Sequence, residues 1–140
     1  MKDPFSLKRF VDAQSRVIDQ VCSELQAGRK CSHWMWYIFP QISGLGSSAM
    51  AREFAISSLT EAAAYLDHPV LGPRLRTCTE RVNAIEGRSI EEVFGYPDHL
   101  KFHSSMTLFA RAAPNEPAFQ AALQKFFAAK LDQLTLDRLS

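Results

Sequence analysis

The sequence predicts an all-α fold: a single compact domain of about seven or eight helices, several of them short, over residues 1–140. Along most of the chain, apolar residues recur at steps of three and four, which is the spacing of one helix face. No stretch shows the strict alternation of a half-buried strand. No linker, internal repeat or low-complexity tract indicates a second domain. A chain of this length buries roughly two-thirds of its unfolded surface, enough for its own core.

The stretch 32–46 contains both tryptophans of the chain and ends in two glycines. Four aromatic rings fall within six positions, and each ring can bury about 150–250 Å². We predict a short buried helix that stops at Pro40, with the other helices packed around it. Trp34 and Trp36 are two residues apart and point in different directions on a helix, so at least one belongs to the core.

The first element is predicted as one amphipathic helix from Leu7 to Leu25. Asp3 or Ser6 is its candidate cap, and Gly28 is its end. Its polar residues are interpreted as a solvated face. These residues are Lys8, Arg9, Asp12, Arg16, Asp19 and Glu24.

Glycines 44 and 46 place a loop over residues 42–48, and Ser47 or Ser48 can cap a short helix over 49–54. Ser58 and Glu61 have the spacing of a capping box and open a helix through Leu66. Further helices are predicted from serine, proline and glycine signals. They cover residues 70–87 after the break at His68–Pro69, a short piece after the Ser89–Glu92 capping box, 97–113, 117–127 and a C-terminal piece through 134–139.

Composition excludes several classes of protein. With 46% hydrophobic and 22% charged residues, the chain is typical of globular proteins rather than disordered ones. Its net charge of +1 provides no broad basic field, so nucleic-acid binding is not indicated. The longest apolar runs are too short to cross a bilayer. We expect a cytoplasmic protein, a monomer or weak homo-oligomer, with no cofactor.

Cysteine and histidine spacing does not indicate a metal or redox centre. Cys22, Cys31 and Cys78 are an odd number at spacings that match neither a zinc motif nor a redox pair. Cys22 and Cys78 fall in apolar rows and are predicted to be core thiols. His99 and His103 are four residues apart, but third and fourth metal ligands are missing. We therefore predict no metal site.

Two segments carry residues capable of chemistry. His33 can act as a general acid or base because the unperturbed pKa of a histidine lies near neutrality, although a packed imidazole bonded to backbone is the favoured interpretation. On a helix, Asp98, Lys101 and Ser105 share one face and could bind an anionic or hydroxylated ligand. A capping aspartate paired with Lys101 is the simpler interpretation. Neither a phosphate loop nor a serine-hydrolase elbow is present in the sequence.

Four segments together resemble a bacterial family, the domain of unknown function 1810, which is sometimes labelled calpastatin-like. They are residues 32–41, 44–46, 65–75 and 98–109. The resemblance spans nearly the whole chain and implies an all-α domain without an assigned activity. A disordered protease inhibitor would not carry this many aromatic residues, so the label conflicts with the composition. His103 stands where the family pattern usually has a basic residue. The family signature implies a candidate site made of Ser32, His33, Trp34, Trp36, Gln41, Asp98, Lys101, Ser104 and Ser105.

Three functions remain open from the sequence. The first is a module that binds a small polar or anionic ligand between residues 32–41 and 98–105. The second is an enzyme in the same pocket, acting by acid/base or hydrolytic chemistry on a small, nucleotide-like substrate. In it His33 or Asp98 would carry the proton and Lys101 would stabilise charge. The third is a protein-interaction domain. The first two predict that His33, Gln41, Lys101 and Ser105 converge on one cavity.

Overall fold

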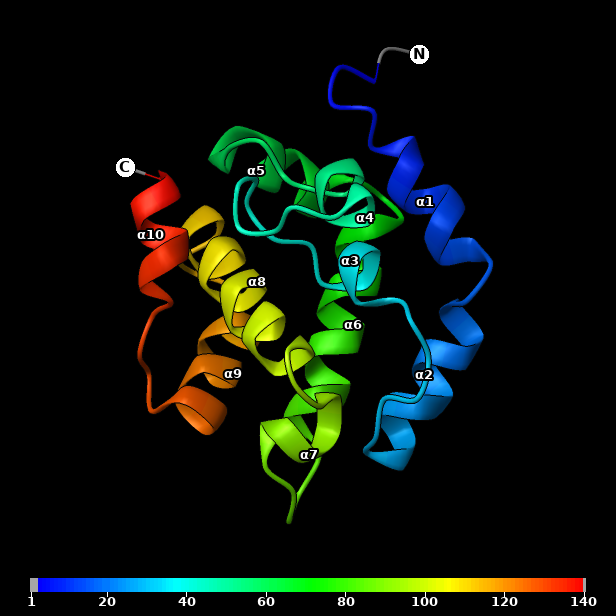
Figure 1. Cartoon of the computed structure of the whole chain (residues 1–140), viewed down its shortest axis with the longest axis vertical. Coiled ribbons are helices and arrows are strands. Elements are labelled where there is room, and N and C mark those ends of the chain that lie inside the picture. The colour runs from blue at the N-terminus through cyan, green and yellow to red at the C-terminus, as the bar shows by residue number, and fades with distance from the viewer. Residues whose placement is uncertain (1–2, 140) are drawn as a thin grey trace.

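The computed structural model describes residues 3–139, and within that range it contains ten helices, seven of them seven residues or longer (Figure 1). They are α1 (Lys8–Ser15), α2 (Ile18–Ala27), α3 (Met35–Ile38), α4 (Ala49–Glu53), α5 (Leu59–Asp67), α6 (Leu71–Asn83), α7 (Ile90–Phe94), α8 (Asp98–Ala112), α9 (Pro117–Phe127) and α10 (Gln133–Leu139). The described residues form no strand beyond an isolated bridge between Ile42 and Ile56. In the same range no helix is both long and apolar enough to cross a membrane. The all-α prediction is confirmed, with slightly more helices than predicted.

The longest helices form the body of the molecule. α8 packs against α5, α7, α9 and α10, and α6 packs against α2, α5 and α9. The short helix α3, cyan at the centre of Figure 1, contacts α1 on one side and α8 on the other. The aromatic stretch is therefore central, as the sequence predicts.

Aromatic side chains of this stretch are part of the core. Trp34 and Phe39 are fully buried and Tyr37 is nearly so, whereas Trp36 is half-buried. The Phe39 ring meets the Phe102 ring of α8 edge to face, with centroids 5.0 Å apart. The prediction that one tryptophan belongs to the core is confirmed for Trp34.

The single first helix predicted from Leu7 to Leu25 is wrong, because the chain breaks between α1 and α2. Val17 leaves the helical region with φ −130° and ψ −3°. Just before it, the Ser15 hydroxyl bonds a carbonyl one turn earlier, a contact that bends helices. Gln14 holds α1 to the core by donating to the Tyr37 carbonyl at 2.7 Å. The break lets α2 take its own direction (Figure 1).

The polar face of this first element is not uniformly solvated, contrary to the prediction. Arg9 donates to the backbone carbonyls of Glu53 and Ala55, each at 2.8 Å. It also pairs with the buried Glu61 at 3.2 Å. Glu24 is only 8% exposed and holds the loop before α3. Charged residues at helical spacing thus serve here as tertiary contacts.

Capping serines begin two helices where the sequence predicts them. Ser89 and Glu92 form a complete capping box, with reciprocal bonds of 3.1 and 2.8 Å. Ser58 also accepts the backbone N–H of Glu61 at 3.1 Å. The Glu61 carboxylate, however, bonds Ser57, so this second box is incomplete.

Other helix boundaries lie close to the predicted ones. The break at His68–Pro69 separates α5 from α6, as predicted. α6 ends at Asn83, before the predicted end at Gly87. Of the two candidate caps for α4, the structure uses Ser48 rather than Ser47.

Candidate functional site

A cavity of about 430 Å³ lies between the chain that follows α3, the first half of α8 and the start of α10. Residues 32–41 and 98–105, the two segments predicted to form a pocket, both contribute to its wall. Its lining residues are Trp36, Gln41, Leu45, Gly46, Ser47, Ser48, Ala51, Pro97, Leu100, Lys101, Ser104, Asp132 and Leu134. The contribution of Asp132 and Leu134 was not predicted.

Lys101, Trp36 and Gln41 present polar groups on one part of the cavity wall. The ammonium of Lys101 lies 4.8 Å from the centroid of the Trp36 ring, a cation–π distance. Across residues 3–139, no group bonds the Trp36 indole N–H or the Gln41 carboxamide. The cavity wall therefore presents a cation, an indole donor and an amide that are available to another molecule.

Asp98 pairs with two lysines, Lys30 just before the segment 32–41 and Lys101 in its own helix. Its carboxylate lies 2.7 Å from the Lys30 ammonium and 3.5 Å from that of Lys101. The Lys30 side chain is 7% exposed and its ammonium lies 5.2 Å from the Trp34 ring. One carboxylate thus serves two ammonium groups. The cluster keeps an excess of one positive charge, and Lys101 makes the weaker of the two contacts.

The wall nearest α10 carries a carboxylate. Asp132 accepts from the Ser104 hydroxyl at 3.0 Å and from the Thr135 hydroxyl at 2.6 Å. It also accepts the backbone N–H of Thr135, which makes it the cap of α10. The backbone N–H of Asp132 donates to Thr107 of α8 at 2.9 Å. These contacts hold the start of α10 against α8 and fix that side of the cavity.

Glu24 of α2 fixes the chain that leads into α3. One carboxylate oxygen accepts from the backbone N–H of Cys31 at 2.7 Å and of Ser32 at 3.0 Å, and from the indole of Trp34 at 3.0 Å. The other oxygen accepts from the Ser32 hydroxyl at 2.6 Å. Burial is the largest single effect and raises the pKa of Glu24. The hydrogen bonds led by Ser32 together outweigh burial and bring the pKa down to about 2.

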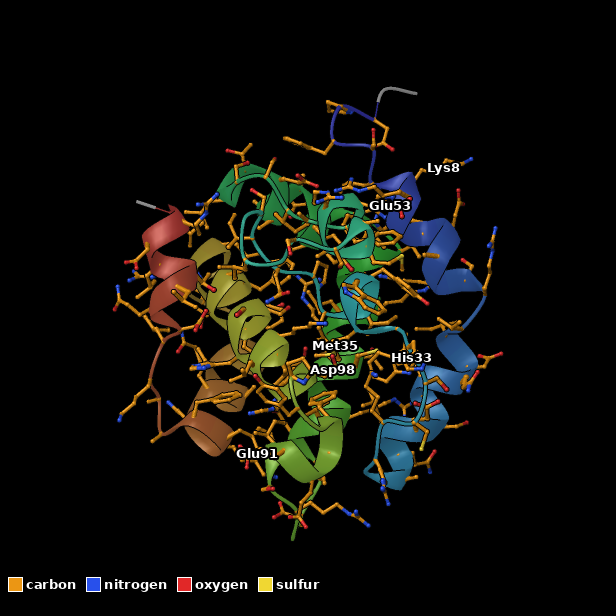
Figure 2. The ribbon with its side chains drawn as sticks, in the orientation of Figure 1. Lys8, His33, Met35, Glu53, Glu91 and Asp98 are labelled. Carbon is orange, nitrogen blue, oxygen red and sulfur yellow. The ribbon has the colours of Figure 1, made fainter. Side chains whose placement is uncertain are left out.

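The structure brings together some of the predicted site residues and not others. Those that line the cavity are Trp36, Gln41, Lys101 and Ser104. Those outside its lining are Ser32, His33, Trp34, Asp98 and Ser105. His33 is exposed and lies toward α2 (Figure 2). Ser105 is fully buried, and no group in the described part of the chain bonds its hydroxyl.

The remaining histidines and cysteines lie elsewhere. Cys78 is buried, which confirms it as a core thiol, and burial raises its pKa to about 12. Cys22, for which the same was predicted, is only half-buried. The His103 ring stacks on Phe127 at 3.9 Å, and its Nε2 lies 2.8 Å from the carbonyl of Lys130. Among the residues that the structure describes, no group of three or more His, Cys, Asp or Glu could hold a metal ion.

Comparison with known proteins identifies the family. A family model described as "Protein of unknown function (DUF1810)" matches residues 4–139. The chain belongs to the DUF1810 family. It is also similar to the conserved hypothetical protein Rv1873 from Mycobacterium tuberculosis, whose crystal structure has 57% sequence identity and a TM-score of 0.97. That match covers 98% of each chain. No curated protein matches the chain. The resemblance drawn from the sequence is confirmed, and membership of DUF1810 assigns no reaction.

Proposed function

We propose that the cavity beside Trp36 binds a small polar or anionic molecule. The observation that supports this is the meeting of Trp36, Gln41 and Lys101, from segments far apart in the sequence, at one cavity of about 430 Å³. A small-molecule site typically has a largely apolar lining with a few polar groups that fix orientation. This cavity has both components.

The distribution of charge favours an anionic group near Lys101. Asp98 lies closer to Lys30 than to Lys101, and Lys30 is the more buried of the two. Most of its negative charge therefore compensates Lys30, which leaves Lys101 with charge to offer. A carboxylate or phosphate beside Lys101 would form a charge-assisted hydrogen bond, which is stronger than a neutral one.

The rest of the ligand would contact apolar side chains and Asp132. Leu100 is 48% exposed and Leu134 is 66% exposed, so both leave apolar surface open at the rim. Asp132 is an acceptor in the wall near them. We therefore infer a ligand with an anionic group at one end, an apolar body and a hydroxyl or N–H group that can donate.

Two alternatives are weaker. The enzyme hypothesis names His33 and Asp98 as proton carriers, but neither lines the cavity, and Asp98 already bonds two lysines. The protein-interaction hypothesis is supported only by exposed apolar side chains, Tyr96 at 82% and the leucines of the rim. Because the enzyme hypothesis uses the same cavity as the binding proposal, ligand binding and turnover have to be measured separately.

The test is a metabolite screen by thermal shift, with each hit titrated by intrinsic fluorescence. Trp34 is fully buried and Trp36 lines the cavity, so quenching reports on Trp36. Lys101→Met should weaken binding of anionic hits about tenfold or more, because a hydrogen bond to a charged group contributes about 1.5–3 kcal/mol. Lys8→Met is the matched control, since Lys8 is on α1 and its side chain is 81% exposed.

Three results would contradict the proposal or its alternative. Hits that bind Lys101→Met and Gln41→Ala as tightly as the native chain do not use this cavity. A screen without hits removes the binding proposal and leaves the interaction domain. Binding without turnover, retained in His33→Ala, removes the enzyme hypothesis.

A further inference from the structure

The cavity beside Trp36 carries charges of both signs that do not pair with each other. Its wall contains the Lys101 ammonium and the Asp132 carboxylate. Within residues 3–139, no ion pair joins these two side chains, and Asp132 has no cationic partner. The cavity therefore offers one group to an anion and another to a cation.

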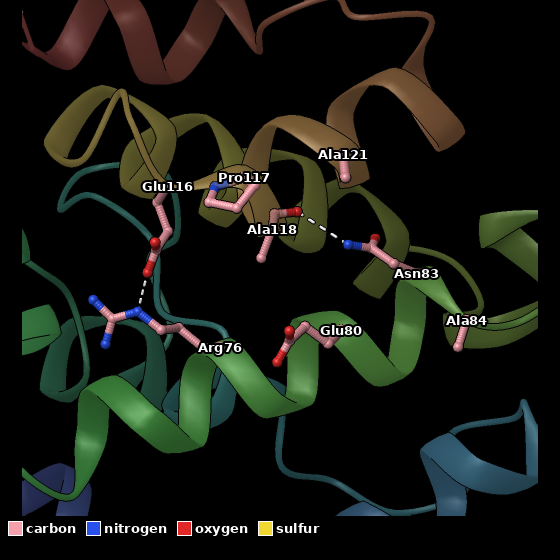
Figure 3. A pocket seen from close by; sticks show the side chains of 8 residues that line it. All are labelled: Arg76, Glu80, Asn83, Ala84, Glu116, Pro117, Ala118 and Ala121. Atoms are coloured by element: carbon pink, nitrogen blue, oxygen red, sulfur yellow. Dashed lines mark hydrogen bonds and ion pairs between the residues drawn. The ribbon is translucent and has the colours of Figure 1, made fainter.

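A second cavity, of about 460 Å³ between α6 and α9, lacks this arrangement (Figure 3). Its cation, Arg76, already pairs with Glu116, as the dashed line in Figure 3 shows. The side-chain amide of Asn83 in its wall donates to the Ala118 carbonyl at 3.0 Å. The two cavities share no lining residue, so a ligand bound beside Trp36 does not contact Asn83.

The Asp132 carboxylate is held in place and keeps one oxygen open. The Ser104 hydroxyl and two groups of Thr135 all donate to the same oxygen, Oδ2. The other oxygen, Oδ1, is accessible, and no group in the described chain donates to it. A hydroxyl of a ligand can donate to this oxygen, but only an ammonium would also neutralise its charge.

The spacing of the two charges limits the length of the ligand. The Lys101 ammonium lies 3.5 Å from the Asp98 carboxylate, at the start of α8. The Asp132 carboxylate lies 3.0 Å from the Ser104 hydroxyl. Asp98 and Ser104 are separated by about 9 Å along the helix axis, at 1.5 Å per residue. An extended dipeptide spans about 7 Å, and a single amino acid about half of that. A dipeptide with a hydrogen bond at each end therefore matches the spacing.

Other groups of the wall suit the middle of such a molecule. The Gln41 carboxamide has no partner in the described part of the chain, so it can pair with the N–H or the C=O of a peptide bond. Leu100 is 48% exposed and lies between Asp98 and Ser104 on α8. Leu134, which is 66% exposed, also lines the cavity. These two leucines provide surface for apolar side chains of a ligand.

We infer that the cavity beside Trp36 binds a dipeptide with apolar side chains. The inference rests on the proposed function, because it names the class of ligand for the same cavity. The C-terminal carboxylate would lie at Lys101, the N-terminal ammonium at Asp132 and the peptide bond near Gln41. A ligand that lacks the ammonium would leave Asp132 without a cation, and one that lacks the carboxylate would leave Lys101 without a second anion.

The test is a two-dimensional ¹H–¹⁵N NMR titration of the full chain with leucyl-leucine. The Trp36 indole N–H and the Gln41 side-chain amide should shift, whereas the Asn83 side-chain amide should not. 4-Methylpentanoyl-leucine, in which a hydrogen replaces the ammonium, should bind about tenfold more weakly, because one charge-assisted hydrogen bond is lost. Leucyl-leucinamide, which lacks the carboxylate, should bind about tenfold more weakly for the same reason. Leucine is too short to reach both charges well and should show a similar loss.

Two variants show which end of the dipeptide meets which residue. Asp132→Asn should weaken leucyl-leucine binding about tenfold and leave 4-methylpentanoyl-leucine unchanged, since that ligand has no ammonium to lose. Lys101→Met should weaken leucyl-leucine equally and leave leucyl-leucinamide unchanged. Asp19→Asn, an equal change of charge at an exposed position of α2, is the control and should bind like the native chain. The ligand series on the native chain gives the same answer if Asp132→Asn does not fold.

The inference and the proposed function can fail separately. The inference is overturned if leucyl-leucine shifts neither Trp36 nor Gln41, if leucine or 4-methylpentanoyl-leucine binds as tightly, or if Asp132→Asn binds like the native chain. If 4-methylpentanoyl-leucine binds as tightly as leucyl-leucine and Lys101→Met weakens both, the anion site remains and only the dipeptide is wrong. Metabolite hits that bind Lys101→Met as tightly as the native chain would instead contradict the proposed function.

Discussion

Two lysine–tryptophan pairs flank the same carboxylate, and they have opposite characters. In the first, Lys30 lies over Trp34 and makes the short contact to Asp98. In the second, Lys101 lies over Trp36 and makes the long one. The first pair is buried, and the second lines a cavity. The same residue types thus serve the core in one place and a candidate site in the other.

The difference comes from what each indole N–H meets. The Trp34 N–H donates to Glu24, and a buried indole requires such a partner. For the Trp36 N–H, the structure describes no acceptor. A tryptophan whose polar atom is satisfied internally is structural, and one whose polar atom faces a cavity is available to a ligand.

The largest expected effect is that of Glu24→Ala. This change leaves the Trp34 indole and two loop N–H groups without their acceptor, and it should lower the free energy of unfolding by about 4 kcal/mol. Urea denaturation measures the loss. Asp19→Ala, a carboxylate of α2 that is exposed, is the control and should change stability by about 0.5 kcal/mol or less. If both changes lower stability equally, the hydrogen bonds from Glu24 to Trp34 and the loop do not stabilise the fold.

The acid dependence of stability should report on the same carboxylate. The pKa of Glu24 falls from 4.5 to about 2 on folding, so its contribution is complete above pH 4.5 and is lost as the pH falls toward 2. The loss should be about 3 kcal/mol. Urea denaturation at a series of pH values from 6 down to 2 measures this loss.

Glu24→Gln is the control for this titration. It should flatten most of the slope between pH 4.5 and 2. A residual slope should remain from Asp3, whose pKa is lowered by the backbone N–H groups of Lys8 and Leu7. An unchanged slope in Glu24→Gln would show that other carboxylates cause the acid loss.

The sequence predicts the positions of the helices better than the tertiary contacts that their side chains make. Periodicity and caps located α8 and the Ser89 capping box, because both depend on local spacing. The break at Val17 does not show in the sequence, because the spacing of apolar residues continues across it and the contact that holds α1 in place, from Gln14 to Tyr37, joins distant residues. Glu24 was interpreted as solvated, although its spacing from Val21 and Gly28 places it on the buried side. That spacing was the signal that could have identified it.

The candidate site was predicted only in part. The family signature, in residues 32–41 and 98–105, predicts three residues that line the cavity: Trp36, Gln41 and Lys101. Asp132 and Leu134 were not found, since nothing in the local pattern places α10 beside α8. The contact depends on Thr107 and Ser104 bonding Asp132, and no spacing rule predicts such side-chain partners.

The smallest expected effect distinguishes the two lysines directly. Asp98→Asn strands the ammonium of Lys30, which is 7% exposed, and should cost about 2 kcal/mol in the free energy of unfolding. Lys101→Met should cost about 0.5 kcal/mol or less, because its pair is longer and more open to solvent.

Double variants test the asymmetry with the same measurement. Adding Lys30→Met to Asp98→Asn should restore part of the lost stability, because it removes the buried unpaired charge. Adding Lys101→Met should restore none, since that ammonium can be hydrated. If both lysine changes rescue Asp98→Asn equally, the two pairs are energetically alike. In that case Lys101 has no more charge to offer a ligand than Lys30 does.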